Sequence, residues 1–431
     1  MYKYHLNHEK LQSCNFPLQN MVKAVSEVSL QKWFRIALFN LLLVAFIGII
    51  LRYKIAFSLP FINQKYLLNT HSHFAFAGWV SQALMTLITS YLNKYSSNIS
   101  LKKYRYLLLA NLITAYGMLL SFPFQGYALI SIIFSTLSIF TVYVFAIIVW
   151  RDLNKIPIKT VSHLWIKASL IFYLISSFGS FALAYMMANK IIHQNWYVAA
   201  VYFFLHFQYN GWFFFTCMGL LADKLNTQII STKLQKIVFY LFSFACIPAY
   251  FLSVLWLPIF GWVYALVILA AFAQVAGWFI LLKKLIKNHQ LVFTKTPNAV
   301  KYIWTLSAIA LSIKLLLQLG STIPALSSWA FGFRPVVIGY LHLILLGVIT
   351  LFIIGYAIHE HYILLNKNAV LGIWIFIAGI ILNELLLMLQ GFGAIKYKSI
   401  PYVNELLLAA ACIMFFGILM MNIANRKASL D

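Results

Sequence analysis

The sequence predicts an all-α, polytopic membrane protein with twelve transmembrane helices. The chain has 431 residues, of which 63% are hydrophobic and only 9% charged, and this composition excludes a soluble globular domain. Its apolar residues form twelve runs of about 20 residues, the length that an α-helix needs to cross the hydrocarbon core. Its basic residues gather in alternate connections between these runs, as expected of a polytopic membrane protein.

The twelve runs divide the chain into spans and short connections. We expect spans over residues 33–53, 68–92, 105–124, 128–150, 164–188, 196–222, 235–256, 260–282, 302–321, 335–358, 368–390 and 402–424. No Gly/Ser-rich or Pro-rich linker and no internal repeat divides them, which predicts one transmembrane domain over residues 33–424. Residues 1–32 lack the apolar core of a signal peptide, so we expect a cytoplasmic lead-in there and a cytoplasmic tail over 425–431.

The placement of lysine and arginine predicts that both termini are cytoplasmic. The connections expected outside carry few basic residues, namely Arg52, Lys54, Lys65, Lys190, Arg334, Lys396 and Lys398. The formal net charge of +24 would suggest nucleic-acid binding in a soluble protein, but here the orientation in the membrane explains it. We therefore expect a multi-pass protein of a bacterial-type inner (cytoplasmic) membrane, with lipids and no nucleic acid as partners.

Four histidines lie within the expected spans. His71 and His73 are about one turn into the second span from the outer side, and His342 is about two turns into the tenth. His206, in the sixth span, is nearer to the middle of the membrane. An imidazole without a partner in hydrocarbon costs several kcal/mol, and neutral imidazole is the commonest metal ligand. A metal or a haem iron is therefore the expected partner.

Two histidines from different helices at similar depth can hold a planar haem between the helices, each through one ring nitrogen. His71 and His73 are two residues apart, so they point about 200° apart around the helix and cannot readily bind one iron together. Either can pair with His342, and the other then contacts a haem edge, a water molecule or the membrane interface. The alternative for both is a structural role, hydrogen-bonded near the headgroups.

The tenth span, VIGYLHLILLG, resembles the I-G-H-x-H-x-x-x-L-G run in helix ten of haem-copper oxidase subunit I, especially of the C-type oxidases. In that family the second histidine binds a low-spin haem and the first binds a high-spin haem. The resemblance puts His342 at the low-spin position. It puts Tyr340 where the high-spin ligand would stand.

The sixth span, FLHFQYNGWF, is similar to the H-L-W-V-E-G-V-W segment of nitric oxide reductases, whose histidine and glutamate bind a non-haem metal. His206 matches the histidine, and Asn210 replaces the glutamate. The seventh span, ACIPAYFLS, lacks the two adjacent metal-binding histidines of the family. A lone imidazole rarely retains copper, so the resemblance implies a degraded or replaced metal centre, with copper or non-haem iron as an open alternative.

The resemblance thus implies a bundle like that of haem-copper oxidase subunit I, with one low-spin, bis-histidine haem b between helices two and ten. The H-x-H opening of the second span is also similar to the H-A-H run of NnrS proteins, which are twelve-helix haem and copper membrane proteins linked to nitric oxide stress. The oxidase family binds haem propionates with basic residues outside the membrane. The corresponding candidates are Arg334, Lys396 and Lys398, and the alternative is that they extend to lipid headgroups.

Ionisable residues inside spans are functional candidates. Lys314 lies in the ninth span, Glu384 in the eleventh and Glu405 near the outer end of the twelfth. We expect Lys314 and Glu384 to form a buried structural pair, and a proton or ion route is the alternative. Further residues that would line a ligand cavity, unless they only pack in the core, are Tyr340, Tyr209 and Asn210.

These observations favour a haem-binding protein that serves electron transfer or the handling of nitric oxide or dioxygen. A quinol or a cytochrome subunit is the expected electron donor, and a respiratory complex is the expected setting. One alternative is an active terminal oxidase or nitric oxide reductase with a second, high-spin haem at an atypical site. Another is a proton-coupled secondary transporter, since twelve spans are common in that class.

Overall fold

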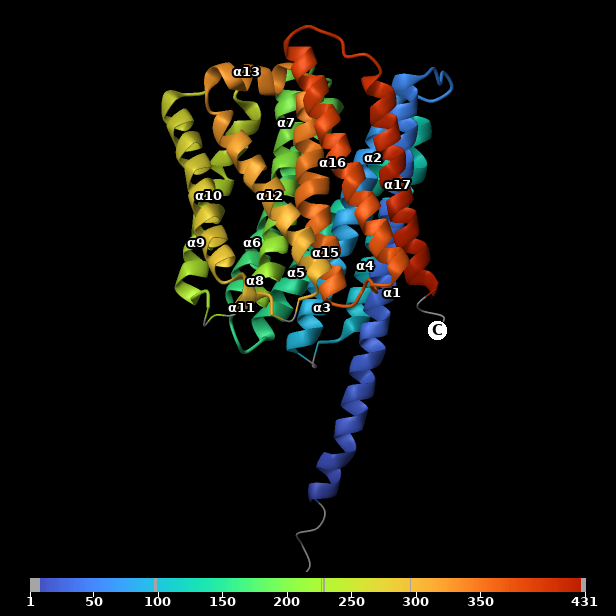
Figure 1. Ribbon diagram of the computed structural model, residues 1–431, viewed down its shortest axis with the longest axis vertical. Coiled ribbons are helices and arrows are strands. Elements are labelled where there is room, and N and C mark those ends of the chain that lie inside the picture. Colours follow the sequence, from blue (N-terminus) through green and yellow to red (C-terminus); the bar gives the residue numbers. More distant parts are fainter. Residues whose placement is uncertain (1–7, 97–98, 226, 228, 295, 428–431) are drawn as a thin grey trace, which may run out of the picture.

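The computed structural model describes residues 8–96, 99–225, 227, 229–294 and 296–427, and from residue 30 onward it also describes nearly all side chains. The regular secondary structure of this part is helical throughout, and the helices stand side by side in one bundle (Figure 1). The predicted all-α fold is therefore confirmed. Residues 1–7 of the expected lead-in and 428–431 of the expected tail lie outside the described residues.

The helices begin and end close to the expected spans. They are α1 (His8–Ala56), α2 (Gln64–His73), η1 (Phe74–Ser81), α3 (Gln82–Tyr95), α4 (Leu101–Gln125), α5 (Leu129–Lys155), α6 (Val161–Ala188), α7 (Gln194–His206), η2 (Phe207–Phe213), α8 (Phe214–Lys224), α9 (Thr232–Cys246), η3 (Pro248–Val254), α10 (Gly261–Lys287), α11 (His289–Val292), α12 (Asn298–Gly320), α13 (Pro324–Gly332), α14 (Arg334–His342), η4 (Leu343–Thr350), α15 (Leu351–His359), α16 (Lys367–Ile395) and α17 (Val403–Lys427).

Nine helices of the described chain are long and apolar enough to cross a membrane. They are Leu30–Ala56, Leu101–Gln125, Leu129–Lys155, Val161–Ala188, Gly261–Lys287, Asn298–Gly320, Arg334–His359, Lys367–Ile395 and Val403–Arg426. A tenth span results if α9 and η3, which meet at a bend of 47°, are counted as one. The chain is therefore a multi-pass membrane protein.

The second and sixth expected spans are also continuously helical, over 64–95 and 194–224. They are not among the nine because polar residues such as His73, Gln82 and Asn210 lower their hydropathy. The two helices that carry most of the candidate site are thus the two least apolar of the predicted set.

Three features of the helices were not predicted. The first helix begins at His8, within the expected lead-in, and its first half extends away from the bundle (Figure 1). The seventh span bends at Pro248, where α9 gives way to the 3₁₀ helix η3, because proline cannot continue the α-helical hydrogen bonding. The connection between the ninth and tenth spans contains the short helix α13.

The bundle has two ends, which we name by their position in Figure 1. The upper end holds α13 and the connection from α16 to α17, and the lower end holds α11 and the extension of α1. The second and tenth helices both run from the upper to the lower end, so residues early in each are near the upper end.

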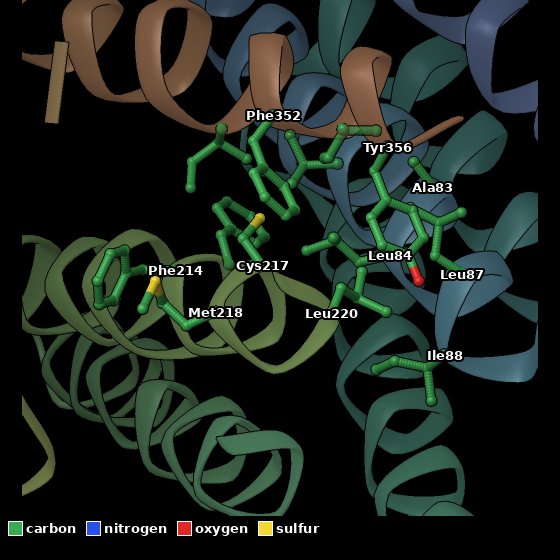
Figure 2. Packing of buried hydrophobic residues seen from close by; sticks show 14 of the residues in the cluster. Ala83, Leu84, Leu87, Ile88, Phe214, Cys217, Met218, Leu220, Phe352 and Tyr356 are labelled. Atoms are coloured by element: carbon green, nitrogen blue, oxygen red, sulfur yellow. The ribbon is translucent and has the colours of Figure 1, made fainter. Parts of the chain in front are cut away.

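The lower halves of the second, sixth and tenth helices meet in the core of the bundle (Figure 2). Lipid tails are as apolar as these side chains, so burying the side chains against one another brings no hydrophobic gain in a membrane. Close van der Waals contact between the helices therefore stabilises the packing. The packed residues shown come from α3, α8 and α15 and are Ala83, Leu84, Leu87, Ile88, Phe214, Cys217, Met218, Leu220, Phe352 and Tyr356.

Candidate functional site

Three helices of the bundle become π-helical directly after a histidine. The segment η1 follows His73, η2 follows His206 and η4 follows His342. A π-helical turn contains an extra residue relative to the α-helix and is found frequently at functional sites. The histidines that the sequence singled out therefore stand at the irregular turns of their helices.

A layer of buried hydrogen bonds joins these three π segments below the upper histidines. The indole Nε1 of Trp79 in η1 donates to the Thr350 hydroxyl at the end of η4, at 3.0 Å. The Ser81 hydroxyl in η1 accepts from Trp212 Nε1 in η2, at 3.2 Å, and from the Tyr173 hydroxyl of α6, at 3.1 Å. The second, sixth and tenth helices are thus held at a defined spacing just below the histidine level.

Above this layer the second and tenth helices pack on different neighbours. The α2 segment packs mainly on α1 and α4, whereas α14 packs on α16. All described residues of α14 retain some exposed surface, although the helix continues into a tightly buried segment below. The rings of His71 on α2 and His342 on α14 interact electrostatically with each other. We call the space between these two rings the histidine gap.

The ring of His342 is oriented by its own helix. Its Nδ1 lies 2.8 Å from the Ile338 carbonyl, and since a carbonyl can only accept, Nδ1 carries the proton. The neutral ring then has a bare Nε2, and no hydrogen bond engages that atom within the described chain. A ring with Nδ1 anchored to a backbone carbonyl and Nε2 free is the form that binds metals in proteins.

The ring of His71 is held against α1. A Cβ atom added to Gly48 would lie 3.5 Å from Cε1 and 3.9 Å from Nδ1 of His71, which are ordinary van der Waals distances, so the ring lies directly beside Gly48. Nδ1 is buried without a well-formed hydrogen bond in the described part of the chain, and the ring's polar contact is with the Val44 backbone of α1. His71 is therefore only weakly satisfied by the protein.

His73 points to a different part of the bundle. Its Nε2 is hydrogen-bonded to the Tyr127 hydroxyl at 2.6 Å, and its ring stacks on Phe122 with centroids 4.6 Å apart and planes 12° apart. The structure therefore separates the two neighbouring histidines. His71 borders the histidine gap, and His73 packs on α4 and the connection that follows it.

Arginine side chains border the histidine gap at the upper end. Arg52 of α1 is half-buried and interacts electrostatically with both His71 and His342, and also with Glu384 and Arg334. From the sequence, Arg52 was expected only as one of the basic residues of the outer connections. Arg52 lies four residues after Gly48, and residues four apart share a helix face. Because Gly48 lies beside His71, this spacing puts Arg52 on the face of α1 nearest to His71.

The remaining charged candidates lie farther from the histidine gap. Lys396 and Lys398 are exposed in the connection between α16 and α17, and the ammonium group of neither makes a hydrogen bond or ion pair in the described chain. Glu405 is exposed in the first turn of α17, where a negative charge stabilises the helix. Their surroundings suit contact with water or headgroups.

His206 has hydrogen-bond partners on both ring nitrogens. The Asn210 amide donates to Nδ1 at 3.1 Å, and Nε2 donates to the Cys246 carbonyl at 2.8 Å. That carbonyl is available because the chain turns into η3 at this point, where the Tyr250 N–H bonds to the Ile247 carbonyl instead. Asn210 and the bend at Pro248 thus satisfy a histidine that the resemblance had placed in a metal centre.

Lys314 and Glu384 do not form the expected pair with each other among the described residues. Lys314 is only 5% exposed and lies near Cys246 and His206. Glu384 accepts a hydrogen bond from the Asn383 amide at 3.1 Å and interacts with Arg52. In the described chain, no group of three or more histidine, cysteine or acidic residues is arranged to hold a metal ion.

Tyr340 and Tyr209 interact with each other in the interior. Tyr209 is buried on η2, and Tyr340 is half-buried on α14, two residues before His342. Together they fill part of the space between the sixth and tenth helices.

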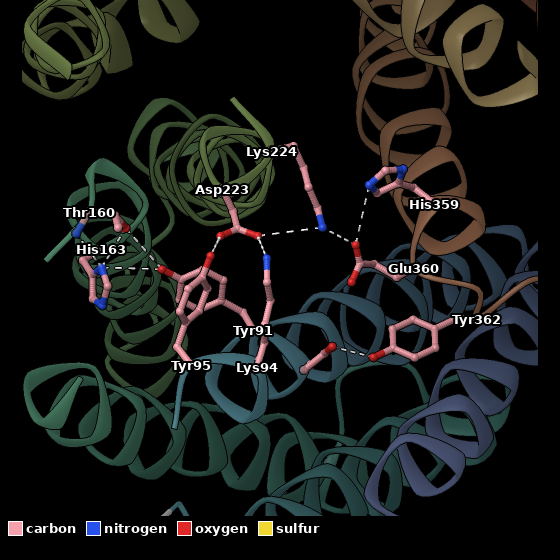
Figure 3. Close-up of polar contacts among 11 residues, drawn as sticks. Tyr91, Lys94, Tyr95, Thr160, His163, Asp223, Lys224, His359, Glu360 and Tyr362 are labelled. Atoms are coloured by element: carbon pink, nitrogen blue, oxygen red, sulfur yellow. Dashed lines mark hydrogen bonds and ion pairs between the residues drawn. The ribbon is translucent and has the colours of Figure 1, made fainter. Parts of the chain in front are cut away.

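A second polar region lies at the lower end (Figure 3). The buried Asp223 carboxylate accepts from the Lys94 ammonium at 2.8 Å and from the Tyr95 hydroxyl. The adjacent Lys224 forms an ion pair with Glu360, the residue after α15. These contacts, which we call the Asp223 network, connect α3, α8 and the end of α15.

The fold and the site together define a multi-pass, all-helical membrane protein with two interacting imidazoles, His71 and His342, near one end. No protein-family model matches the chain, and the search of curated proteins found no match.

Proposed function

We propose that this protein is an integral membrane haem protein with one low-spin haem b held by His71 and His342, serving electron transfer or the handling of nitric oxide or dioxygen. In this proposal the chain crosses a bacterial-type inner membrane twelve times with both termini in the cytoplasm, in a plan resembling haem-copper oxidase subunit I. Such a haem supplies a reversible one-electron couple.

The observation that carries the proposal is the pair of facing imidazoles. His71 and His342 come from different helices and interact electrostatically, and each ring is bonded to backbone through one side, His342 to the Ile338 carbonyl and His71 to Val44, which leaves one nitrogen of each ring for a ligand. The anchored Nδ1 of His342 directs Nε2 outward from its helix. Two neutral imidazoles on opposite sides of a gap are the donor set of a bis-histidine haem.

The arginines at the upper rim support the same assignment. A haem b carries two propionate carboxylates, which need cationic or hydrogen-bonding partners. Arg52 lies near both histidines and Arg334 lies near Arg52, so the positive charge is on the side of the gap where the propionates would face water. We therefore assign the propionates to Arg52 and Arg334 rather than to Lys396 and Lys398.

A second haem and a non-haem metal fit the described residues poorly. The high-spin ligand position holds Tyr340, which interacts with Tyr209. His206 uses both ring nitrogens in hydrogen bonds, so binding a metal there would break at least one of them. This argues for one haem and against an active oxidase or nitric oxide reductase site of the usual composition.

The test is spectroscopic. The protein purified in mild detergent is expected to show a reduced-minus-oxidised b-type spectrum, one haem per chain and no shift with carbon monoxide. His342→Ala is expected to lose the spectrum, and His359→Ala, at the lower end of the same helix, is expected to keep it.

Other outcomes distinguish the competing functions. Two haems per chain with a carbon monoxide shift would favour the oxidase or reductase. A stable protein that contains no haem would overturn the proposal, and uptake of a substrate by proteoliposomes of that protein would favour the transporter.

A further inference from the structure

A cleft of ≈ 550 Å³ opens at the upper end, between α7, the segment that follows η3, α10 and α13. Its size is within the range of about 300–1,000 Å³ typical of small-molecule sites. The residues that line it are Gln194, Asn195, Val198, Tyr202, Leu255, Trp256, Tyr264, Pro324, Ser327, Ser328 and Gly332. None of these lining residues is charged, although the chain as a whole is strongly basic.

The lining combines aromatic rings with uncharged hydrogen-bonding groups. The amides of Gln194 and Asn195 form no hydrogen bond in the described chain, and the Ser327 hydroxyl, on a residue only 8% exposed, likewise has none. The Tyr264 hydroxyl donates to the Thr322 carbonyl just before α13, which fixes α13 against α10. The cleft therefore has polar groups without a hydrogen-bond partner in the described chain, and the Tyr264 hydrogen bond holds one side of the cleft in place.

The cleft lies at the level of the membrane surface. The α13 helix crosses the upper end of the bundle (Figure 1), and it and its entry expose Ile323, Leu326 and Trp329 at 53%, 38% and 48% while Ser327 is buried. Exposed aliphatic and tryptophan side chains on one face of a short helix are typical of the interface between hydrocarbon and headgroups. A ligand can therefore enter the cleft from the membrane.

The cleft also has a connection to the histidine gap through tyrosines. Tyr202 lines the cleft and interacts with Tyr209, which in turn interacts with Tyr340 on α14. Tyr340 stands two residues before His342. Tyrosines that interact electrostatically thus lie between the wall of the cleft and the helix that carries His342.

We propose that this cleft binds the headgroup of a membrane quinone. A quinone ring is uncharged, planar and apolar on its faces, and it carries oxygens that accept hydrogen bonds. Amides and a hydroxyl supply the donors, and Tyr202, Trp256 and Tyr264 supply ring surfaces for stacking. A phospholipid headgroup would need a cationic partner for its phosphate, and the lining contains none.

The experiment measures binding of a short-chain ubiquinone to the full-length protein in phosphatidylcholine nanodiscs, with an azido-substituted analogue for cross-linking. We expect saturable binding and labelling of peptides from α7 or α13. The double variant Gln194→Ala/Asn195→Ala, whose two side chains are exposed and contribute no internal hydrogen bond, is expected to bind at least tenfold more weakly. Ser328→Phe, which fills the cleft from the exposed side of α13, is expected to bind as weakly.

Asn189→Ala is the matched control, because Asn189 is an exposed amide at the same end that does not line the cleft; its affinity is expected to equal that of the unmodified protein. Equal affinity in the double variant, labelling confined to other helices, or labelling that excess unlabelled quinone does not reduce would each overturn the inference.

Although the inference adds an electron donor to the proposed function, the binding itself does not need haem. His342→Ala is therefore expected to bind the quinone unchanged, so that a failure of the cleft and a failure of the haem assignment are distinguishable.

Discussion

The second and tenth helices have polar residues at both ends of the bundle, but these residues are paired with opposite charges only at the lower end. At the lower end, Lys94 and Glu360 each pair with an opposite charge, on Asp223 and Lys224. At the upper end, His71 and His342 interact electrostatically with each other, and neither ring bonds to another side chain of the described chain. Groups that pair internally stabilise a fold, whereas imidazoles without a side-chain partner remain available to the proposed ligand.

His163 shows that an unpaired nitrogen alone does not identify a ligand site. Its Nε2 is buried without a partner in the described chain, yet the charges that surround it are Lys159, Lys167 and Asp223. The histidine gap differs because a second imidazole stands opposite the first. His206 is the third case, with both nitrogens satisfied inside the protein.

The largest expected effect separates the two neighbouring histidines. His71→Ala removes one of the two proposed iron ligands and is expected to reduce the haem content from one per chain to none. His73→Ala removes only the hydrogen bond to Tyr127 and the stacking on Phe122, so its haem content is expected to stay near one. Haem and protein assays on the two purified variants measure this, and the reverse result would place the ligand at His73.

The next largest expected effect tests the ion pairs of the Asp223 network at the lower end. Asp223→Ala leaves Lys94 and Lys224 without their shared carboxylate. Breaking a fully buried ion pair costs about 3–5 kcal/mol, and because Lys94 is partly exposed we expect about 2–3 kcal/mol here. Unfolding in a graded series of denaturing detergent measures the loss. The haem content of the folded fraction is expected to remain unchanged, and a loss of haem without a loss of stability would contradict the comparison.

A smaller effect tests the rim of the histidine gap. Arg52→Gln removes the charge assigned to a propionate, and a hydrogen bond to a charged group contributes about 1.5–3 kcal/mol. We expect haem to transfer to apomyoglobin at least tenfold faster. Lys396→Gln is the control at the same end, with an unchanged rate. An equal effect of both variants would assign the propionates to the connection between α16 and α17.

The smallest expected effect concerns His206, whose two ring nitrogens both form hydrogen bonds. His206→Phe keeps most of the ring volume but leaves the Cys246 carbonyl and the Asn210 amide without their partner, at a cost of about 1–2 kcal/mol. The haem spectrum is expected to be unchanged. Loss of a bound metal or a change in the spectrum of the purified variant would instead identify His206 as a ligand.

The positions of the helices were predictable because they depend on local composition. Runs of apolar residues between basic connections located most spans within a few residues, except for the start of the first helix, and the positions of His71 and His342 near the upper end followed from counting along the helix. The bend at Pro248 was less visible, since neighbouring helices can compensate for a proline inside a membrane. The pairing of Lys314 with Glu384 was expected from charge alone, and the structure instead places these residues near Cys246 and Arg52 respectively.

By itself, the sequence determined that this chain is a bundle of membrane helices with imidazoles near one end of two of them, because hydropathy and length are properties of each segment. Only the tertiary structure decided that His71 and not His73 borders the histidine gap, that Arg52 lies beside it and that His206 is internally bonded. The physical reason is rotation: the direction in which a helix turns its side chains depends on the neighbours that pack against it, and those neighbours are distant in the chain.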